Sequence, residues 1–503
     1  MNSLLSKYKA FLLTFLVVLP SLVWAQKITN PRPFARSISI EDMRKNLSVI
    51  ASADMEGRET ATEGQRKAAA YIENEFKSIG LAPGNKDSYE MYFPVYADSL
   101  LNLSLSVNDT EFTAGKDFSV YLQSGYSARY YFSEIVFVGE GRSDQFRDDY
   151  KDIDVRGKLV MAFSDEHGKI GDKSNQPRLN WIAQQLAAMK NGAAALLIVT
   201  KRIPPLVSKS NMYVNLYQKS QRLNTFFIST ELAEKISGIQ LNELRNENRP
   251  AVYEANTALN LSKVSLEMQS SNVLGFLEGS DLKDEFVILT AHYDHLGKRG
   301  DTIWYGADDD GSGTVTILEL AKAFSEAKKA GKGPRRSILF MTVSGEEKGL
   351  WGSDYYASHP TVDLDKVTVN LNIDMVGRID PSRKYGDSTR YIYVIGDDKL
   401  SSDLKSISEA VNKKYTKLEL DYKYNDPKDP ERIYYRSDHY NFAKNGVPVI
   451  FYFSGLHPDY HKPTDTPDKI NFPLLQKRAL LVFYTAWEMA NRNQMLKRDI
   501  PLP

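Results

Sequence analysis

The stretch FVILTAHYD, residues 286–294, decides the fold. Residues 286–291 form an apolar run of strand length, and His292 and Asp294 follow it directly. In α/β proteins, ligand-binding side chains gather at the carboxyl ends of buried parallel strands. We therefore expect a buried strand over 286–291 and a functional site immediately after it.

The second half of the chain repeats this pattern, because strand-like runs alternate with helical stretches. Such alternation predicts a mainly parallel mixed sheet with helices on both faces, which is an α/β fold. Further strands are expected over 337–343, 367–373, 391–395 and 447–453. Helices are expected over 311–329, 404–415 and 474–491.

The first half has a different texture. Residues 39–83 are predicted to be helical, because 65–79 carries apolar residues at spacings of three and four. After them, short strand-like pieces predominate as far as residue 260. We therefore predict one α/β domain made of residues 39–96 and 261–495, interrupted by a β-rich insertion over 97–260.

The composition is that of a globular protein with a full core. Of the 503 residues, 42% are apolar and 25% are charged, and Lys+Arg and Asp+Glu both total 64. With zero net charge and no basic stripe, nucleic acid is not expected as a partner. The chain has no cysteine, so disulfides are excluded, and a core of this size can do without them.

The first 25 residues have the pattern of a secretory signal peptide. Lys7 and Lys9 give a short positive region, residues 10–23 are mostly apolar, and Val23 and Ala25 suit the two cleavage positions. The alternative is a retained membrane anchor, but the apolar run is short for a span. We expect export to the periplasm or the medium, with no membrane span after cleavage.

Carboxylates and imidazoles cluster around the predicted strand ends in five separate segments. Side chains from separate strand ends can converge on one point, as metal binding requires. Two His, one Asp able to bridge, two further carboxylates and one spare Glu are the inventory of a two-zinc hydrolase site with a general base. The candidates are His292, Asp294, Asp308, Asp309, Asp310, Glu346, Glu347, Asp374 and His461.

Several segments also have a simpler interpretation, and His292 could be a capping His at a strand end. Three acids at 308–310, just before a predicted helix, are good capping residues, and an acid-rich loop with glycine can bind calcium. The calcium reading is weak, because the twelfth loop residue, Glu319, falls inside the helix. Adjacent glutamates such as Glu346 and Glu347 are often only a solvated pair of charges. At a strand end, however, one of them can bind metal while the other takes a proton.

Two further patterns leave choices open. Four of the seven His lie in or beside the candidate segments, and the pattern alone does not choose between His457 and His461 as a ligand. Ser437-Asp438-His439 has the residue types of a serine-hydrolase triad. Triad members converge from separate elements, however, and no Gly-x-Ser-x-Gly elbow is present.

Taken together, the motifs resemble those of the exported bacterial di-zinc aminopeptidases, whose relatives include glutamate carboxypeptidases and glutaminyl cyclases. The resemblance covers about 39–95 and 262–495 and implies the zinc exopeptidase fold. The helical start, 53–83, is also similar to that family. The matching stretches are AHYDHLG (291–297), GADDDGSGT (306–314), SGEEKGLWGS (344–353), NIDMVGR (372–378), RSDHYNFAKNGVP (436–448) and YHKPTDTPDKI (460–470).

The resemblance implies a pair of zinc ions. His292 and Asp374 would bind one ion, Glu347 and His461 would bind the other, and Asp309 would bridge them. In the family pattern the ligand His precedes x-x-x-Asp-Thr, which selects His461 over His457.

The resemblance also implies catalytic roles. Glu346 would be the general base, Asp294 would orient His292, and Tyr460 matches a tyrosine that helps stabilise the transition state in some relatives. The expected activity is hydrolysis of the N-terminal residue from peptides with a free N-terminus, by a metal-activated water. The alternatives are a carboxypeptidase, which Arg436 leaves open, a glutaminyl cyclase, and a non-catalytic receptor-like binding protein.

The insertion resembles a protease-associated domain. The stretch YKDIDVRGKLVMAF (150–163), then a helix and KNGAAALLIVTKR (190–202), has the usual shape of such domains. They carry no catalytic chemistry and are thought to gate access to a peptidase or to bind partners. The segment KSNQPRLN (173–180) departs from the simplest forms.

Overall fold

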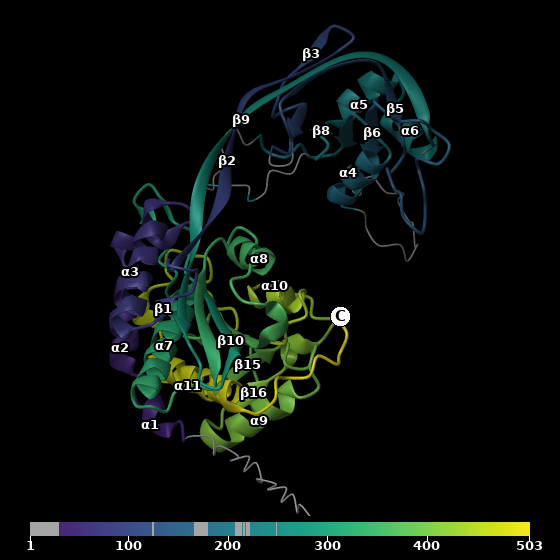
Figure 1. Ribbon diagram of the computed structural model, residues 1–503. Coiled ribbons are helices and arrows are strands. Elements are labelled where there is room, and N and C mark those ends of the chain that lie inside the picture. Colours follow the sequence, from purple (N-terminus) through teal and green to yellow (C-terminus); the bar gives the residue numbers. More distant parts are fainter. Residues whose placement is uncertain are drawn as a thin grey trace, which may run out of the picture.

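The structure is a computed structural model (Figure 1). The signal peptide expected over 1–25 and residues 173–179 lie outside the part of the chain that it describes. Within that part, no helix has both the length and the apolar character needed to cross a membrane. The described residues are 30–122, 125–164, 180–206, 214, 217, 222–247 and 249–502.

A mixed sheet forms the centre of the fold and confirms the predicted α/β class. Its middle strands are parallel neighbours in the order β17 (Val449–Phe453), β14 (Val367–Ile373), β10 (Leu282–His292) and β13 (Arg336–Val343). Beyond β17 come β15 (Tyr391–Ile395), which is antiparallel to it, and β16 (Glu419–Asp421), which is parallel to β15. The strands expected from the apolar runs are therefore present, and four of them meet at one carboxyl edge.

Helices cover both faces of this sheet, because successive side chains of a strand point to opposite faces. On β10, Val287 and Leu289 pack into one buried cluster and Ile288 into another. The second cluster includes residues of two short helices, α8 (Trp351–Ser358) and α10 (His439–Ala443). The first cluster is covered by α2 (Ile40–Ile50), α3 (Glu63–Ile79), α7 (Gly313–Lys329), α9 (Leu404–Tyr415) and α11 (Phe472–Asn491).

The helical prediction for 39–83 is wrong in its middle. A short irregular turn, η1 (Ala53–Arg58), separates α2 from α3, and Glu56 and Gly57 have left-handed backbone angles in it. A Cβ on Gly57 would lie 2.3 Å from the carbonyl oxygen of Gly297, so only glycine allows this close approach. The turn thus places the N-terminal segment directly against the loop that follows β10.

A long antiparallel ribbon leads away from this domain. It consists of β2 (Glu90–Val107) and β9 (Ala251–Leu277), paired from Glu90↔Val273 to Val107↔Thr257. Figure 1 shows the ribbon rising from the α/β domain and curving towards a second group of strands. Because β9 pairs with β13 at one end and with β5 (Ala128–Phe137) at the other, both groups belong to one sheet.

The second group of strands continues the sheet from β5. The strands β6 (Leu159–Phe163), β7 (Ala195–Val199) and β8 (Thr225–Ile228) follow in parallel, and β4 (Phe118–Val120) ends the order as an antiparallel strand. Two buried clusters lie on its faces. The helices of this part are α4 (Trp181–Lys190), α5 (Thr230–Ser237) and α6 (Leu241–Glu247).

Candidate metal centre

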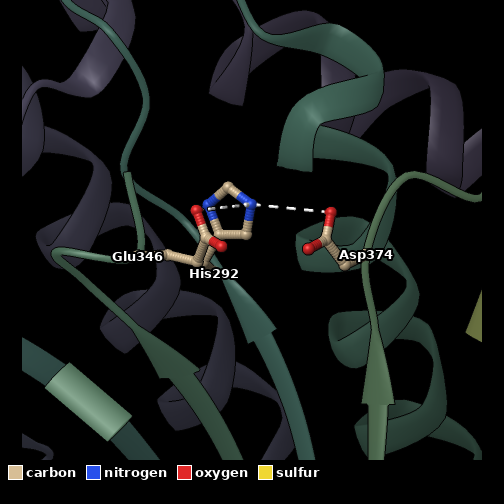
Figure 2. A group of neighbouring side chains, drawn as sticks. All are labelled: His292, Glu346 and Asp374. Carbon is tan, nitrogen blue, oxygen red and sulfur yellow. Dashed lines mark ion pairs between the residues drawn. The ribbon is translucent and has the colours of Figure 1, made fainter. Parts of the chain in front are cut away.

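The candidate site lies at the carboxyl edge of the central sheet. His292 is the last residue of β10, Asp374 directly follows β14, and Glu346 and Glu347 follow β13 after two residues. Figure 2 shows His292 between Glu346 and Asp374, with both carboxylates turned towards the imidazole. The predicted strand ends have therefore brought residues that are far apart in sequence to one place.

Asp309 joins two groups of donors. Its Oδ1 lies 3.2 Å from His292 Nε2, and its Oδ2 lies 3.2 Å from His461 Nε2. On one side, His292 Nε2 is also 3.6 Å from Asp374 Oδ1; on the other, His461 Nε2 is 3.1 Å from Glu347 Oε2. All five sequence-predicted ligands thus converge, as two sets that share one carboxylate.

The donor set fits metal ions. Two ligands of a tetrahedral zinc, with bonds of about 2.0–2.2 Å, lie about 3.3 Å apart, close to the spacings of 3.1–3.6 Å found here. Among the described residues, no hydrogen-bond partner is found for the buried atoms His292 Nε2 and Asp309 Oδ2. Buried polar atoms are normally satisfied, so these two point to bound cations.

The electrostatics of the site favour positive charge. Burial alone would lower the pKa of His292, but Glu346 and Asp374 raise it well above its usual range. Burial would also lower the pKa of His461, but Asp309 and Glu347 raise it to about 10. Burial would raise the pKa of Asp309, but the two imidazoles hold it well below the ordinary value. Without metal, protons on the imidazoles offset the buried negative charge.

Glu346 differs from the five candidate ligands. Its Oε2 lies 3.9 Å from His292 Nε2, farther than any of the donor pairs above. Burial, together with the neighbouring Glu347 and Asp374 carboxylates, raises its pKa well above the ordinary value despite the opposing effect of His292. The group is thus close enough to act on a molecule held at the site, and its pKa suits a proton acceptor.

Several neighbours hold the site residues in place. Asp294 lies beside His292 Nδ1, with its backbone oxygen at 3.0 Å and its carboxylate at 3.7 Å. That carboxylate also accepts hydrogen bonds from the Glu346 backbone N–H and from the Thr60 hydroxyl, at 3.2 and 2.7 Å. Asp294 therefore links the strand β10, the Glu346 loop and the N-terminal segment.

Two of the three acids at 308–310 have structural partners. Asp310 accepts hydrogen bonds from the backbone N–H of His292, Gly313 and Met375, and Asp308 accepts one from Gly377. Only the middle residue, Asp309, faces both imidazoles. The capping interpretation therefore holds for Asp310, which caps the start of α7.

The geometry favours His461 over His457 as a candidate ligand. His461 faces Asp309 and Glu347, whereas His457 Nε2 lies 3.3 Å from Asp308 Oδ2. His457 thus supports the loop that carries Asp309.

Ser437, Asp438 and His439 do not form a triad. Ser437 donates a 2.6 Å hydrogen bond to Asp374 Oδ2, while Asp438 accepts one from Ser353. His439 is fully buried, and burial lowers its pKa to about 3. The serine-hydrolase interpretation is excluded, and Ser437 instead fixes the orientation of the candidate ligand Asp374.

Sequence reasoning assigned no role to four residues that contact the site: Arg58, Thr60, His295 and Ser437. Arg58 is fully buried and donates hydrogen bonds to the backbone oxygens of Tyr293, Tyr305 and Gly306, among others. These contacts join segments more than 200 positions apart, so no local pattern could predict them. For His295, the signal was its position in AHYDHLG, beside the candidate ligand.

The outer wall of the site contains Tyr460. Its ring stacks on that of His461, with centroids 3.8 Å apart, and its hydroxyl accepts a 3.2 Å hydrogen bond from Arg436. Burial raises the pKa of the phenol, which keeps its proton at neutral pH. Tyr460 can therefore donate a hydrogen bond to a molecule bound beside His461.

The fold and this site define a metal-dependent hydrolase of the exopeptidase type. Residues 272–486, which are less than half of the chain, match the model of Peptidase family M28. This result confirms the resemblance found in the motifs.

Individual relatives agree with the family. A "Probable leucine aminopeptidase" of Trichophyton verrucosum is 29% identical over 260 residues, which are 50% of this chain and 67% of that protein. Aminopeptidase YwaD of Bacillus subtilis is 26% identical over 270 residues, 52% of this chain and 53% of its own length. The chain thus matches about half to two thirds of the length of these relatives. An aminopeptidase from Aneurinibacillus sp. strain AM-1 shares the fold, with a TM-score of 0.57 and 20% identity over 94% of this chain and 99% of that chain.

Proposed function

We propose that this protein is a zinc-dependent aminopeptidase that removes N-terminal residues from peptides. The observation that carries the proposal is the position of Asp309, whose two oxygens each lie 3.2 Å from a different imidazole. A carboxylate between two sets of donors is what a two-metal hydrolase requires. The family match and the aminopeptidases of Trichophyton verrucosum and Bacillus subtilis support the same activity.

Two zinc ions are the cofactors that the side chains fit. One ion would be held by His292 and Asp374, and the other by Glu347 and His461. Asp309 would bind both ions. Imidazole and carboxylate are normal zinc ligands, although cobalt or manganese accept the same donors. When bound, such a pair supplies Lewis acidity, which lowers the pKa of a water and polarises the scissile carbonyl.

Glu346 is assigned the proton transfers. Its buried carboxylate has a raised pKa, so it is basic enough to take a proton from the attacking water and to deliver it to the leaving amine. Asp294 accepts the backbone N–H of Glu346 and fixes the loop that carries this carboxylate. Tyr460 would donate a hydrogen bond to the carbonyl oxygen as negative charge develops there.

The cavity beside these residues suggests the substrate class. Its lining includes Asp309, Glu346 and Asp374, which would attract a free α-ammonium group. Most of the other lining residues are apolar, so we propose a preference for apolar N-terminal side chains. The apolar lining residues are Met375, Ile433, Phe451, Phe453 and Leu456.

Metal analysis combined with turnover of matched substrates tests the proposal. The protein should contain two zinc ions, hydrolyse leucine p-nitroanilide, and leave N-acetyl-leucine p-nitroanilide intact. Glutamate p-nitroanilide, which has a charged side chain, should be a poor substrate. Equal cleavage of the blocked substrate would refute an aminopeptidase. Release of C-terminal residues would indicate a carboxypeptidase, cyclisation of N-terminal glutamine a cyclase, and no turnover by the two-zinc protein a binding role.

Export and the nature of the insertion are further parts of the proposal. The pattern of residues 1–25 supports removal of a signal peptide, so the mature chain should begin at Gln26. N-terminal sequencing of the exported protein tests this, and a chain that still begins at Met1 would contradict it. For residues 97–260, the order β6, α4, β7 over 159–199 supports a protease-associated domain.

A further inference from the structure

His295 is a buried histidine beside the second donor set, and the two-zinc scheme above gives it no part. Its ring is fully buried, and its Nδ1 lies 2.7 Å from Glu347 Oε1. Together with Asp309 and Glu347 it forms one of the two groups in the described chain whose atoms are close enough to hold an ion. His295 is therefore either a metal ligand or a group that holds one.

The distances separate these two possibilities. The donor pairs of the proposed zinc sites lie 3.1–3.6 Å apart, near the spacing of about 3.3 Å that two ligands of one tetrahedral zinc require. The contact of 2.7 Å between His295 Nδ1 and Glu347 Oε1 is shorter, and it has the length of a hydrogen bond to a charged acceptor.

The two oxygens of Glu347 also face different imidazoles. His461 Nε2 lies 3.1 Å from Oε2 and 3.2 Å from Asp309 Oδ2, whereas His295 Nδ1 lies 2.7 Å from Oε1 and 3.8 Å from Asp309 Oδ2. A carboxylate that ligates a metal through one oxygen and accepts an N–H on the other has a fixed orientation.

The surroundings of the ring fix its position. The backbone N–H of His295 donates to the Arg58 carbonyl at 3.2 Å. On one side of the ring lies Gly306, where a Cβ would come within 2.5 Å of His295 Cγ. Gly306 precedes the loop that carries Asp309, so the imidazole is confined between this loop and Glu347.

We propose that His295 is a positioning residue that donates its Nδ1–H to Glu347 Oε1 and thereby tightens the metal subsite of Glu347 and His461. This inference rests on the proposed zinc enzyme. In this tautomer Nε2 carries only a lone pair, so the ring leaves no buried N–H without an acceptor. The subsite of His292 and Asp374 has no such histidine among the described residues, so the two subsites should differ in their dependence on His295.

The test is zinc binding by the metal-free protein, measured in competition with a chelator of known affinity. His295→Ala should bind one of its two ions about 10–100-fold more weakly and the other nearly as before. His295→Asn places an amide N–H near the position of Nδ1 and should recover most of the loss. His359→Ala is the control, because His359 is an exposed histidine whose ring stacks on Tyr355.

Two results would overturn the inference. If His295→Ala binds both ions like the parent protein, His295 does not position Glu347. If both His295→Ala and His295→Asn bind only one ion at saturating zinc, while circular dichroism shows that they are folded, His295 is itself a ligand. A parent protein that takes up no zinc would instead refute the proposed enzyme, and with it this role.

Discussion

The adjacent carboxylates Glu346 and Glu347 should respond differently to the same substitution. Glu346→Gln keeps the shape of the side chain and removes its basicity. Because Glu346 lies 3.9 Å from His292, beyond the 3.1–3.6 Å of the donor pairs, its loss should leave two zinc ions in place. Loss of the general base should lower kcat by about 10²–10⁴-fold, or about 3–5 kcal/mol in the activation barrier.

The matched variant is Glu347→Gln. It removes a charged ligand that lies 3.1 Å from His461 Nε2 and 2.7 Å from His295 Nδ1. One ion should then bind much more weakly, and added zinc should restore part of the activity. For Glu346→Gln, added zinc should restore none.

Both variants can be followed by metal analysis and by steady-state kinetics with leucine p-nitroanilide. In Glu346→Gln the loss of activity should appear in kcat rather than in KM, because the other contacts between enzyme and substrate are unchanged. A Glu346→Gln enzyme with near-normal kcat would place the base elsewhere. A Glu346→Gln enzyme that has lost one zinc would mean that the roles of the two glutamates are exchanged.

Three further predictions concern other parts of the molecule. Tyr460→Phe removes a hydroxyl beside His461 and should lower kcat by about 10²-fold with little change in KM; unchanged kcat would exclude it from transition-state stabilisation. Burial raises the pKa of Glu319 from 4.5 to about 7, so it should stabilise the fold below pH 4.5 and lose that contribution as the pH rises through 7. Between pH 4 and pH 8, the free energy of unfolding from chemical denaturation should fall by about 3 kcal/mol more in the parent than in Glu319→Gln. An equal change in the two proteins would contradict this prediction. Replacing residues 101–262 by Asn-Gly joins Leu100 to Lys263, which already pair across the ribbon, and the shortened protein should fold and bind two zinc ions; a folded product without metal would make the insertion part of the site.

The sequence predicts the main strands of the central sheet well, because β13, β14, β15 and β17 are buried along their whole length and rich in apolar residues. The run 286–291 is found inside β10, and 367–373 coincides with β14. The same logic places His292 and Asp374 at the site, since parallel strands end at the same edge. Which acid of 308–310 faces the imidazoles depends on the conformation of the loop in the folded protein, and the sequence pattern does not reveal it.

The ribbon and the supporting contacts could not be predicted in this way. Much of the ribbon is exposed, and the alternation of polar and apolar residues along β9 changes phase at Lys263, so the full length of the ribbon is not apparent from the sequence. The hydrogen bonds of Thr60 to Asp294 and of Arg58 to Tyr293 join residues 234 and 235 positions apart. Such partners become visible only when the chain is folded.

The shared strand β9 has a consequence for how this gene can change. Its ladder is continuous from the α/β domain to the second group of strands, so a single-codon insertion or deletion within it would turn every later side chain to the opposite face. Two places escape this constraint. The pairing of β9 with β2 shifts between Leu100 and Asn102, where the intervening Leu101 is 67% exposed, and its pairing with β5 shifts between Phe132 and Glu134. Changes in length should therefore accumulate at these two bulges or in the loops of the insertion, while the rest of the ribbon keeps its length.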